Sequence, residues 1–263
     1  MDLGLKGKVA IVTGGASNIG RGISLTLGAE GANVVIADLD EKQAAKTVGD
    51  IKAAGGKAAA FKVDITKYDE VDGMVKKVIE QFGKVDILVN NAGWDAFAFF
   101  VDTTPDLWEK IIKINYVGMM NCTKAVLRPM INQKSGAIVS ISSDSSRVGG
   151  PREAVYSGCK GAINSLSKTL ARENGRFNIR VNVISPGATP PKQEDIGEGS
   201  MHYGVQGPAS SPEAQKELLR LYPLGRICTP KDIANAVAFL ASDAASFITG
   251  QLVSVSGGYS VVG

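Results

Sequence analysis

The sequence predicts a doubly wound α/β fold: a Rossmann-like, seven-stranded parallel sheet with helices on both faces, in a single domain over residues 1–263. Short, uninterrupted apolar runs alternate with amphipathic stretches almost to the end of the chain, which indicates strands buried on both faces. A glycine-rich turn joins the first apolar run to the first amphipathic stretch. A chain of 263 residues is long enough for one large hydrophobic core.

The predicted elements alternate through the first half of the chain. Strands are expected at residues 9–12, 33–37, 58–63 and 85–89, and helices at 19–30, 41–54 and 69–82 between them. A longer helix is predicted over about 105–131. Pro105 suits its first turn, Thr104 can cap it, and Pro129 is expected to kink or end it.

The second half continues this pattern, with one interruption. Strands are expected at 137–141, 179–184 and 251–255, and helices at 155–174 and from about residue 230. Residues 187–223 are rich in proline and glycine and follow the sixth strand. Because this fold binds ligands beyond the carboxyl ends of its strands, we expect a substrate lid here. A disordered surface loop is the alternative interpretation.

Composition argues against several classes of partner. The net charge is +3 without any long basic run, so neither nucleic acid nor a membrane surface is indicated as a partner. No apolar stretch is long enough for a transmembrane helix, and the first residues lack a signal-peptide core. Three scattered cysteines and one histidine, His202, predict a reduced cytoplasmic protein without disulfides or a metal site. His202 is expected in a loop.

The glycine-rich turn is a candidate nucleotide site. Glycines between a strand and a helix let the backbone approach a pyrophosphate, which the helix N-terminus stabilises. Asp38 ends the second strand 18 residues beyond Gly20, where a carboxylate would accept hydrogen bonds from the adenosine ribose and repel a 2′-phosphate. No basic residue lies at 15–18 or directly after Asp38, so NAD is favoured over NADP. Asp38 can also cap the following helix.

Ser143, Tyr156 and Lys160 form a candidate proton-transfer site. Tyr156 and Lys160 are four residues apart in the predicted helix 155–174 and therefore share one face. The phenol has an intrinsic pKa of about 10, and a neighbouring ammonium favours the phenolate. Ser143 follows the fifth strand and could orient a substrate oxygen, so the three groups suit a secondary alcohol or a ketone. By itself, a Tyr–Lys pair at this spacing would indicate only a solvated helix face.

The chain resembles the short-chain dehydrogenase/reductase family along nearly its whole length. Beyond the motifs above, the matching residues are Asp64-Ile65, Asn90-Asn91-Ala92-Gly93, Asn115, Pro186-Gly187, Ile248-Thr249-Gly250-Gln251 and Ser256-Gly257-Gly258. The resemblance implies an NAD-dependent oxidoreductase with the catalytic tetrad Asn115, Ser143, Tyr156 and Lys160. Asn115 would hold a water that links Lys160 to solvent, and Lys160 would bind the nicotinamide ribose. The implied cofactor contacts are Gly14, Ser17, Asn18, Ile19, Gly20, Asp38, Asp64, Ile65, Asn91, Ala92, Gly93, Tyr156, Lys160, Pro186, Gly187 and Thr189.

A narrower resemblance is to the 2-hydroxycyclohexanecarboxyl-CoA dehydrogenases and related β-hydroxyacyl-CoA dehydrogenases of aromatic degradation. It runs through residues 91–95, 143–149, 153–161 and 255–258. It implies a small-molecule substrate, a CoA thioester among the candidates, that contacts Trp94, Asp144, Arg147 and Arg152. Arginines 147 and 152, together with Lys192, could meet CoA phosphates. The direction of the reaction stays open, because one site serves both alcohol oxidation and ketone reduction.

Two positions depart from the family pattern. Asn18 stands where the family carries glycine, and Pro191 stands where it carries the threonine that contacts the nicotinamide amide, although Thr189 is close by. Asparagine tolerates positive φ better than most residues. These departures motivate a second hypothesis, a non-catalytic subunit of a hetero-oligomer. The resemblance otherwise implies a homotetramer.

Overall fold

The computed structural model describes residues 2–197, 200 and 212–261. Seven strands form one sheet in the order β3-β2-β1-β4-β5-β6-β7, and all six pairings are parallel. The strands are β1 (Val9–Thr13), β2 (Asn33–Asp38), β3 (Lys57–Lys62), β4 (Ile87–Asn90), β5 (Gly136–Ile141), β6 (Ile179–Pro186) and β7 (Leu252–Val255). The predicted fold class is confirmed. The strand order reverses direction between β1 and β4, which opens a crevice at their carboxyl ends.

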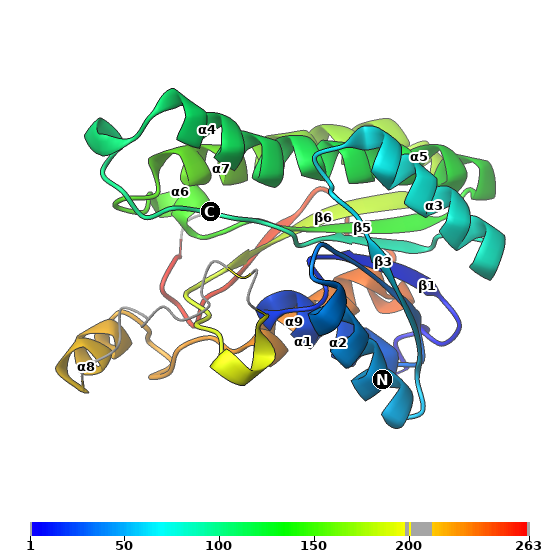
Figure 1. Cartoon of the computed structure of the whole chain (residues 1–263), viewed down its shortest axis with the longest axis horizontal. Coiled ribbons are helices and arrows are strands. Elements are labelled where there is room, and N and C mark those ends of the chain that lie inside the picture. Colours follow the sequence, from blue (N-terminus) through cyan, green and yellow to red (C-terminus); the bar gives the residue numbers. More distant parts are fainter. Residues whose placement is uncertain (1, 198–199, 201–211, 262–263) are drawn as a thin grey trace.

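Helices cover both faces of the sheet (Figure 1). On one face lie α3 (Tyr68–Phe82), α4 (Pro105–Ile112), α5 (Gly118–Gln133) and α7 (Ala154–Asn174). On the other lie α1 (Asn18–Ala29), α2 (Glu41–Ala53) and α9 (Pro230–Ala241). Short elements are η1 (Phe100–Asp102), α6 (Ser145–Val148), η3 (Gly175–Phe177) and η5 (Asp243–Ala245). No helix within the described ranges has the length and apolar character needed to cross a membrane.

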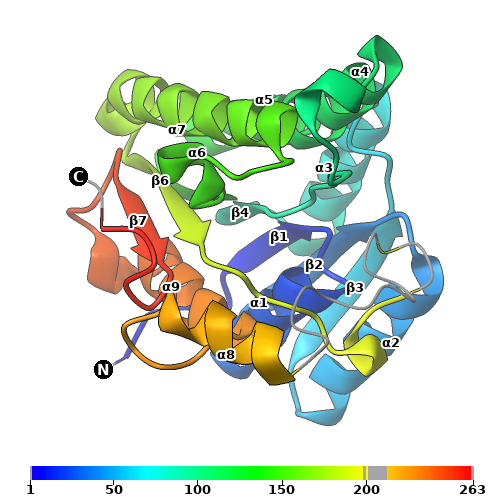
Figure 2. The ribbon, with the colours of Figure 1, turned by 90° about the vertical axis from the view of Figure 1, so that its left-hand side faces the viewer.

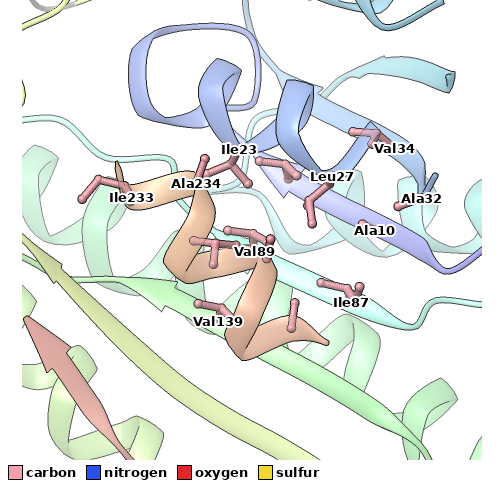
Figure 3. Close-up of a cluster of buried hydrophobic side chains, with 14 of the residues drawn as sticks. Ala10, Ile23, Leu27, Ala32, Val34, Ile87, Val89, Val139, Ile233 and Ala234 are labelled. Carbon is pink, nitrogen blue, oxygen red and sulfur yellow. The ribbon is translucent and has the colours of Figure 1, made fainter. Parts of the chain in front are cut away.

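Two apolar layers sandwich the sheet, because its central strands are buried on both sides. In the layer under α1 and α9, Leu27 and Ile233 belong to one buried cluster with Val89 and Val139 of the central strands (Figure 3). The opposite layer joins α3, α5 and α7 to the same strands. Each large side chain so buried contributes about 1.5–3 kcal/mol. The core thereby holds the carboxyl ends of β1, β4 and β5 in fixed positions.

The long helix predicted over 105–131 differs in two respects. A π-helical turn, Lys113–Val117, separates α4 from α5. The expectation that Pro129 ends the helix is wrong, since α5 continues to Gln133. Proline forfeits one backbone hydrogen bond. The fully buried side chains of Val126 and Met130 anchor the turn around it in the core.

The region after β6 is more ordered than its composition indicates. It contains a 3₁₀ turn, η4 (Gln193–Asp195), and a helix, α8 (Pro212–Arg220). The alternative interpretation as a disordered loop is therefore wrong for these two segments. Residues 198–199 and 201–211 of the predicted lid, His202 among them, lie outside the described residues.

Candidate active site

The predicted catalytic side chains come together beyond the carboxyl ends of β4 and β5. Ser143 follows β5 directly, and Tyr156 and Lys160 lie one turn apart near the start of α7. The Lys160 Nζ lies 5.2 Å from the centroid of the Tyr156 ring, and Tyr156 is hydrogen-bonded to Ser143. The Ser143 Oγ also accepts a hydrogen bond of 2.9 Å from the hydroxyl of Ser145. The sequence spacing therefore does produce one polar cluster.

Lys160 is buried, with 3% of its surface exposed. Its Nζ donates a 2.9 Å hydrogen bond to the carbonyl oxygen of Ile141, the last residue of β5. Burial lowers the pKa of Lys160 to about 8, against the opposing effects of Cys159 and Asp95. The ammonium is thus held against the strand end, with part of its proton affinity lost.

The side chains around Tyr156 do not favour its phenolate. Burial raises the pKa of the phenol above its ordinary value, and the charges of Glu153 and Asp95 raise it further. The hydrogen bond with Ser143 lowers it only in part. The expectation that Lys160 makes the phenolate favourable therefore needs correction, since the Lys160 ammonium is directed to the Ile141 carbonyl. A further cationic group bound against the phenol would lower the pKa of Tyr156.

Asn115 lies in the π-helical turn and is 1% exposed. Its Oδ1 accepts from the Trp94 amide at 3.3 Å, and its Nδ2 donates to the Trp94 carbonyl at 2.6 Å. A Cβ on Gly93 would lie only 2.9 Å from this Oδ1 and 3.4 Å from the Lys160 Nζ. Asn115 therefore ties the segment after β4 to the helix, and Gly93 lets both side chains approach the backbone.

The glycine-rich turn contains two residues in the left-handed region of backbone conformation. Gly14 and Asn18 both have positive φ, 60° and 44°. Asn18 accordingly takes the left-handed conformation open to the glycine it replaces. The Asn91 Nδ2 donates to the carbonyls of Thr13 and Gly14, at 3.0 and 3.1 Å, and so fixes the turn from the end of β4. Ser17 is the N-cap residue of α1 but makes no capping hydrogen bond through its side chain.

Asp38 lies beside this turn at the end of β2. Its carboxylate accepts hydrogen bonds from the amides of Ala16 and Asp40, at 3.0 and 3.1 Å. Burial raises its pKa, and these hydrogen bonds partly offset the rise. The alternative interpretation of Asp38 as a helix cap is wrong, because Asp40 caps α2 by accepting from the Gln43 amide. The Asp38 carboxylate is thus free of the capping role and faces the turn.

The other predicted cofactor residues occupy the same edge. Asp64 follows β3 and accepts hydrogen bonds from the amide and hydroxyl of Thr66, while Ile65 is buried. Gly187 donates its amide to the Val255 carbonyl directly after β6. Thr189 accepts a hydrogen bond at its carbonyl from the Asn18 Nδ2, at 3.2 Å. Pro186, Ala92, Ile19 and Gly20 lie at the ends or starts of the elements that meet there.

Residues 189–197, here called the strap, run from the end of β6 across the carboxyl edge of the sheet towards α2 (Figure 2). Four contacts hold the strap to α1 and α2 or to the turn before α1. They are Asn18 Nδ2 to Thr189 O (3.2 Å), Gly197 N to Ser17 Oγ (3.4 Å), Lys46 Nζ to Glu194 O (2.7 Å) and the Arg21–Asp195 ion pair (3.3 Å). Part of the predicted lid therefore lies on the nucleotide side of the crevice.

The four predicted substrate residues have different surroundings. The Lys110 Nζ lies 3.7 Å from the centroid of the Trp94 ring. Arg152 is exposed, and its guanidinium donates to the Phe97 carbonyl at 2.9 Å. Arg147 is half-buried. Asp144 is buried, and its carboxylate accepts the Ser254 hydroxyl at 2.9 Å, which gives it a role in joining β5 to β7.

Sequence reasoning did not single out two carboxyl groups near Tyr156, those of Asp95 and Glu153. Both raise the pKa of Tyr156. Asp95 follows the Asn91–Gly93 motif and Glu153 precedes Tyr156, and neither position indicates in the sequence that the fold brings the two carboxyl groups close together. Among the described residues, no group of three or more His, Cys, Asp or Glu side chains is arranged to hold a metal ion.

Comparisons with known proteins agree with this geometry. A family model described as enoyl-(acyl carrier protein) reductase matches residues 14–260. A 3-oxoacyl-[acyl-carrier-protein] reductase FabG from Thermotoga maritima is 34% identical over 97% of this chain and 98% of its own length. An uncharacterized oxidoreductase from Methylorubrum extorquens is 40% identical, with coverage of 97% and 98%. The crystal structure of gox2181 superimposes with a TM-score of 0.87 at 37% identity and covers 98% of this chain and 97% of that one.

Proposed function

Because the chain belongs to the short-chain dehydrogenase/reductase family, whose members act on hydroxy and keto substrates, we propose that it is an NAD-dependent oxidoreductase of β-hydroxyacyl thioesters, with CoA as the carrier. The observation that carries this proposal is the cluster of Ser143, Tyr156 and Lys160 at the crevice edge, beside a glycine-rich turn shaped for a pyrophosphate. Two relatives named as 3-oxoacyl reductases support a thioester with oxygen at the β position.

The residues of this chain divide the chemistry between them. The Tyr156 hydroxyl exchanges a proton with the substrate oxygen, and the Ser143 hydroxyl donates a hydrogen bond to the same oxygen. Lys160 supplies positive charge next to Tyr156. The turn from Gly14 to Gly20 would hold a dinucleotide, since a Cβ at Gly20 would lie 1.9 Å from the Gly14 carbonyl oxygen. When bound, a nicotinamide dinucleotide supplies hydride transfer and a positive ring that favours the phenolate.

Replacing Asp38 by alanine is expected to weaken NAD binding about tenfold and to reduce the preference over NADP. The change removes the carboxylate that would accept hydrogen bonds from the ribose and repel a 2′-phosphate. Isothermal titration calorimetry with both cofactors measures the effect. Glu41→Gln is the matched control, because Glu41 is an exposed carboxylate at the start of α2. Equal NAD and NADP affinities in the unaltered protein would contradict the role given to Asp38.

The Asp195→Asn variant is expected to release NADH about two- to fivefold faster, because it removes the partly buried ion pair between the strap and Arg21. Stopped-flow fluorescence of bound NADH gives the release rate. Glu194→Gln is the control, since Glu194 binds Lys46 through its backbone carbonyl, which the substitution keeps. Identical release rates in all three proteins would show that the strap does not restrain the cofactor.

The surroundings of the crevice support an apolar acyl group on an anionic carrier. Phe97, Phe99 and Phe100 are more than half exposed in the segment between β4 and α4. The guanidinium of Arg152 lies 5.8 Å from the Phe99 ring and bonds to the backbone of Phe97. Aromatic side chains beside an exposed arginine suit an alicyclic or aromatic acyl group carried by a phosphate-bearing CoA.

The function is tested by a substrate screen. Alicyclic and aryl β-hydroxyacyl-CoA thioesters are supplied with NAD, and formation of NADH is followed by absorbance. Turnover with a thioester and little or none with the corresponding simple secondary alcohols is the expected result. Efficient turnover of simple alcohols alone would contradict the thioester assignment while leaving the oxidoreductase intact.

The second candidate function is a non-catalytic subunit of a hetero-oligomer, suggested by Asn18 and Pro191. The left-handed conformation of Asn18 and its hydrogen bond to Thr189 favour a competent turn instead. Failure of the isolated protein to bind either NAD or NADP would favour the subunit hypothesis.

For the assembly we propose a homotetramer, supported by the full exposure of Phe247 near β7 in the single chain.

A further inference from the structure

Two carboxyl groups beside Tyr156 have no part in the steps described above. Asp95 lies in the segment after β4, two residues beyond Gly93, and Glu153 immediately precedes α7. Asp95 is only 5% exposed. Neither of its carboxylate oxygens reaches a well-formed hydrogen bond among the described residues, and only the adjacent Ala96 amide and the charge of Lys160 offset its burial. Burying a carboxylate without well-formed hydrogen bonds lowers the stability of the folded protein. A carboxylate kept in such a place beside the candidate catalytic side chains therefore calls for a functional explanation.

The backbone holds both carboxyl groups in place. The Ala98 amide donates to the Arg152 carbonyl at 3.1 Å, and the Arg152 guanidinium donates to the Phe97 carbonyl at 2.9 Å. These bonds join the segment that carries Asp95 to the segment that carries Glu153. The Glu153 side chain folds back over Gly150, where a Cβ would lie 2.1 Å from the Glu153 Oε2. The two groups therefore belong to one constrained structure.

The charges around Glu153 favour its protonated form. Burial and, second to it, the charge of Asp95 together raise the pKa of Glu153 to about 7. The other ionisable groups beside this segment are Tyr156, Cys159 and Lys160 of α7 and the guanidinium of Arg152. Lys160 lowers the pKa of Asp95 by its charge. The Lys160 charge therefore favours the ionised form of Asp95, and the Asp95 charge favours the protonated form of Glu153.

We propose that Asp95 and Glu153 determine the substrate class, by admitting a neutral carbonyl next to the reacting alcohol and excluding a carboxylate. The protonated Glu153 can donate a hydrogen bond to a thioester carbonyl oxygen, which is an acceptor only. The Asp95 charge repels an anionic group placed there. This inference rests on the proposed function, which puts the alcohol oxygen at Tyr156. It adds the reason why a thioester, and not the free β-hydroxy acid, is the substrate.

The charge effect is tested with two compounds that differ only at this carbonyl. They are the N-acetylcysteamine thioester of 3-hydroxybutyrate, whose carrier is uncharged, and free 3-hydroxybutyrate. The Asp95→Asn variant is expected to lower the thioester-to-acid ratio of kcat/KM about tenfold, by removing the repulsive charge. Asp102→Asn is the control, because Asp102 is an exposed carboxylate in the same segment. An unchanged ratio in Asp95→Asn would overturn the inference.

The proton on Glu153 is tested through the pH dependence of KM. As pH rises through about 7, Glu153 loses its proton and can no longer donate, so KM for the thioester rises about fivefold. Glu153→Gln keeps a donor at every pH and is expected to show a flat KM profile. Glu153→Ala lacks the donor and is expected to show a high KM throughout. A purely structural role would change kcat and stability together and would not separate the glutamine from the alanine variant.

The outcomes separate this inference from the proposed function. Unaltered protein that turns over neither these compounds nor the alicyclic and aryl CoA thioesters of the screen, but oxidises a simple secondary alcohol, would overturn the proposed thioester function and the inference with it. Unaltered protein that turns over the thioester, with a KM independent of pH between 6 and 8, would leave the proposed function standing and overturn the role of Glu153.

Discussion

Replacing Tyr156 by phenylalanine is expected to lower kcat by a factor of at least about 10³, because the variant keeps the ring but loses the hydroxyl that is proposed to exchange a proton with the substrate oxygen. The phenol is hydrogen-bonded to Ser143 and adjoins Lys160. Neither neighbour is expected to replace it, because an aliphatic hydroxyl such as that of Ser143 is a much weaker acid than a phenol, and the Lys160 Nζ is bonded to the Ile141 carbonyl. Steady-state kinetics with the best thioester and NAD measure the effect.

The cofactor affinity of the Tyr156→Phe variant is expected to change little, because the glycine-rich turn and Asp38 lie on other elements. Calorimetry with NAD verifies that the fold and the nucleotide site survive. Tyr68→Phe, at the start of α3, is the matched control and should keep its activity. Retention of a tenth or more of the turnover in Tyr156→Phe would refute the proton-transfer role.

Replacing Gly20 by alanine is expected to reduce cofactor affinity at least about 100-fold and to destabilise the protein by about 1–3 kcal/mol. The added Cβ would lie 1.9 Å from the Gly14 carbonyl oxygen and 2.5 Å from the Asn91 Nδ2. The first atom belongs to the turn that would meet the pyrophosphate, and the second holds that turn from the end of β4. Because Asn91 bonds to the carbonyls of Thr13 and Gly14, the strain passes to the whole turn.

Gly73→Ala is a matched control for this substitution. Gly73 lies within α3, and a Cβ there would meet nothing within 4 Å. The change should stabilise the protein by about 0.5–1 kcal/mol, since alanine has the higher helix propensity. Thermal unfolding and NAD calorimetry on both variants give the comparison. Normal NAD affinity in Gly20→Ala would show that the turn does not form the cofactor site.

Most of the fold follows from local sequence patterns. Strands buried on both faces are apolar along nearly their whole length, so β1 and β2 can be recognised in the sequence as continuous apolar runs. The tyrosine and lysine four residues apart lie on one face of α7, as helix geometry requires. The glycines between β1 and α1 make the turn before α1 recognisable. Asn18 there has positive φ, which asparagine tolerates better than most residues do. These features depend on neighbours within a few residues.

Other features depend on contacts between distant segments. The sequence offers Asp38 as a candidate cap for the following helix, and only the packed structure assigns the cap to Asp40. Asp144 is predicted as a substrate residue, and only the folded chain brings its carboxylate to the hydroxyl of Ser254, 110 residues away. The strap lies on the nucleotide side of the crevice because Arg21 and Lys46 bind it there.

The sequence by itself therefore determined the fold class, the position of the glycine-rich turn and the set of side chains proposed as catalytic. Tertiary structure alone decided the protonation preferences. Burial raises the pKa of Tyr156 and lowers that of Lys160. The fold also brings Asp95 close to Glu153, which lies 58 residues further along the chain. The free energy of a charge depends on the solvent and the charges around it in space, and a linear pattern carries no record of either.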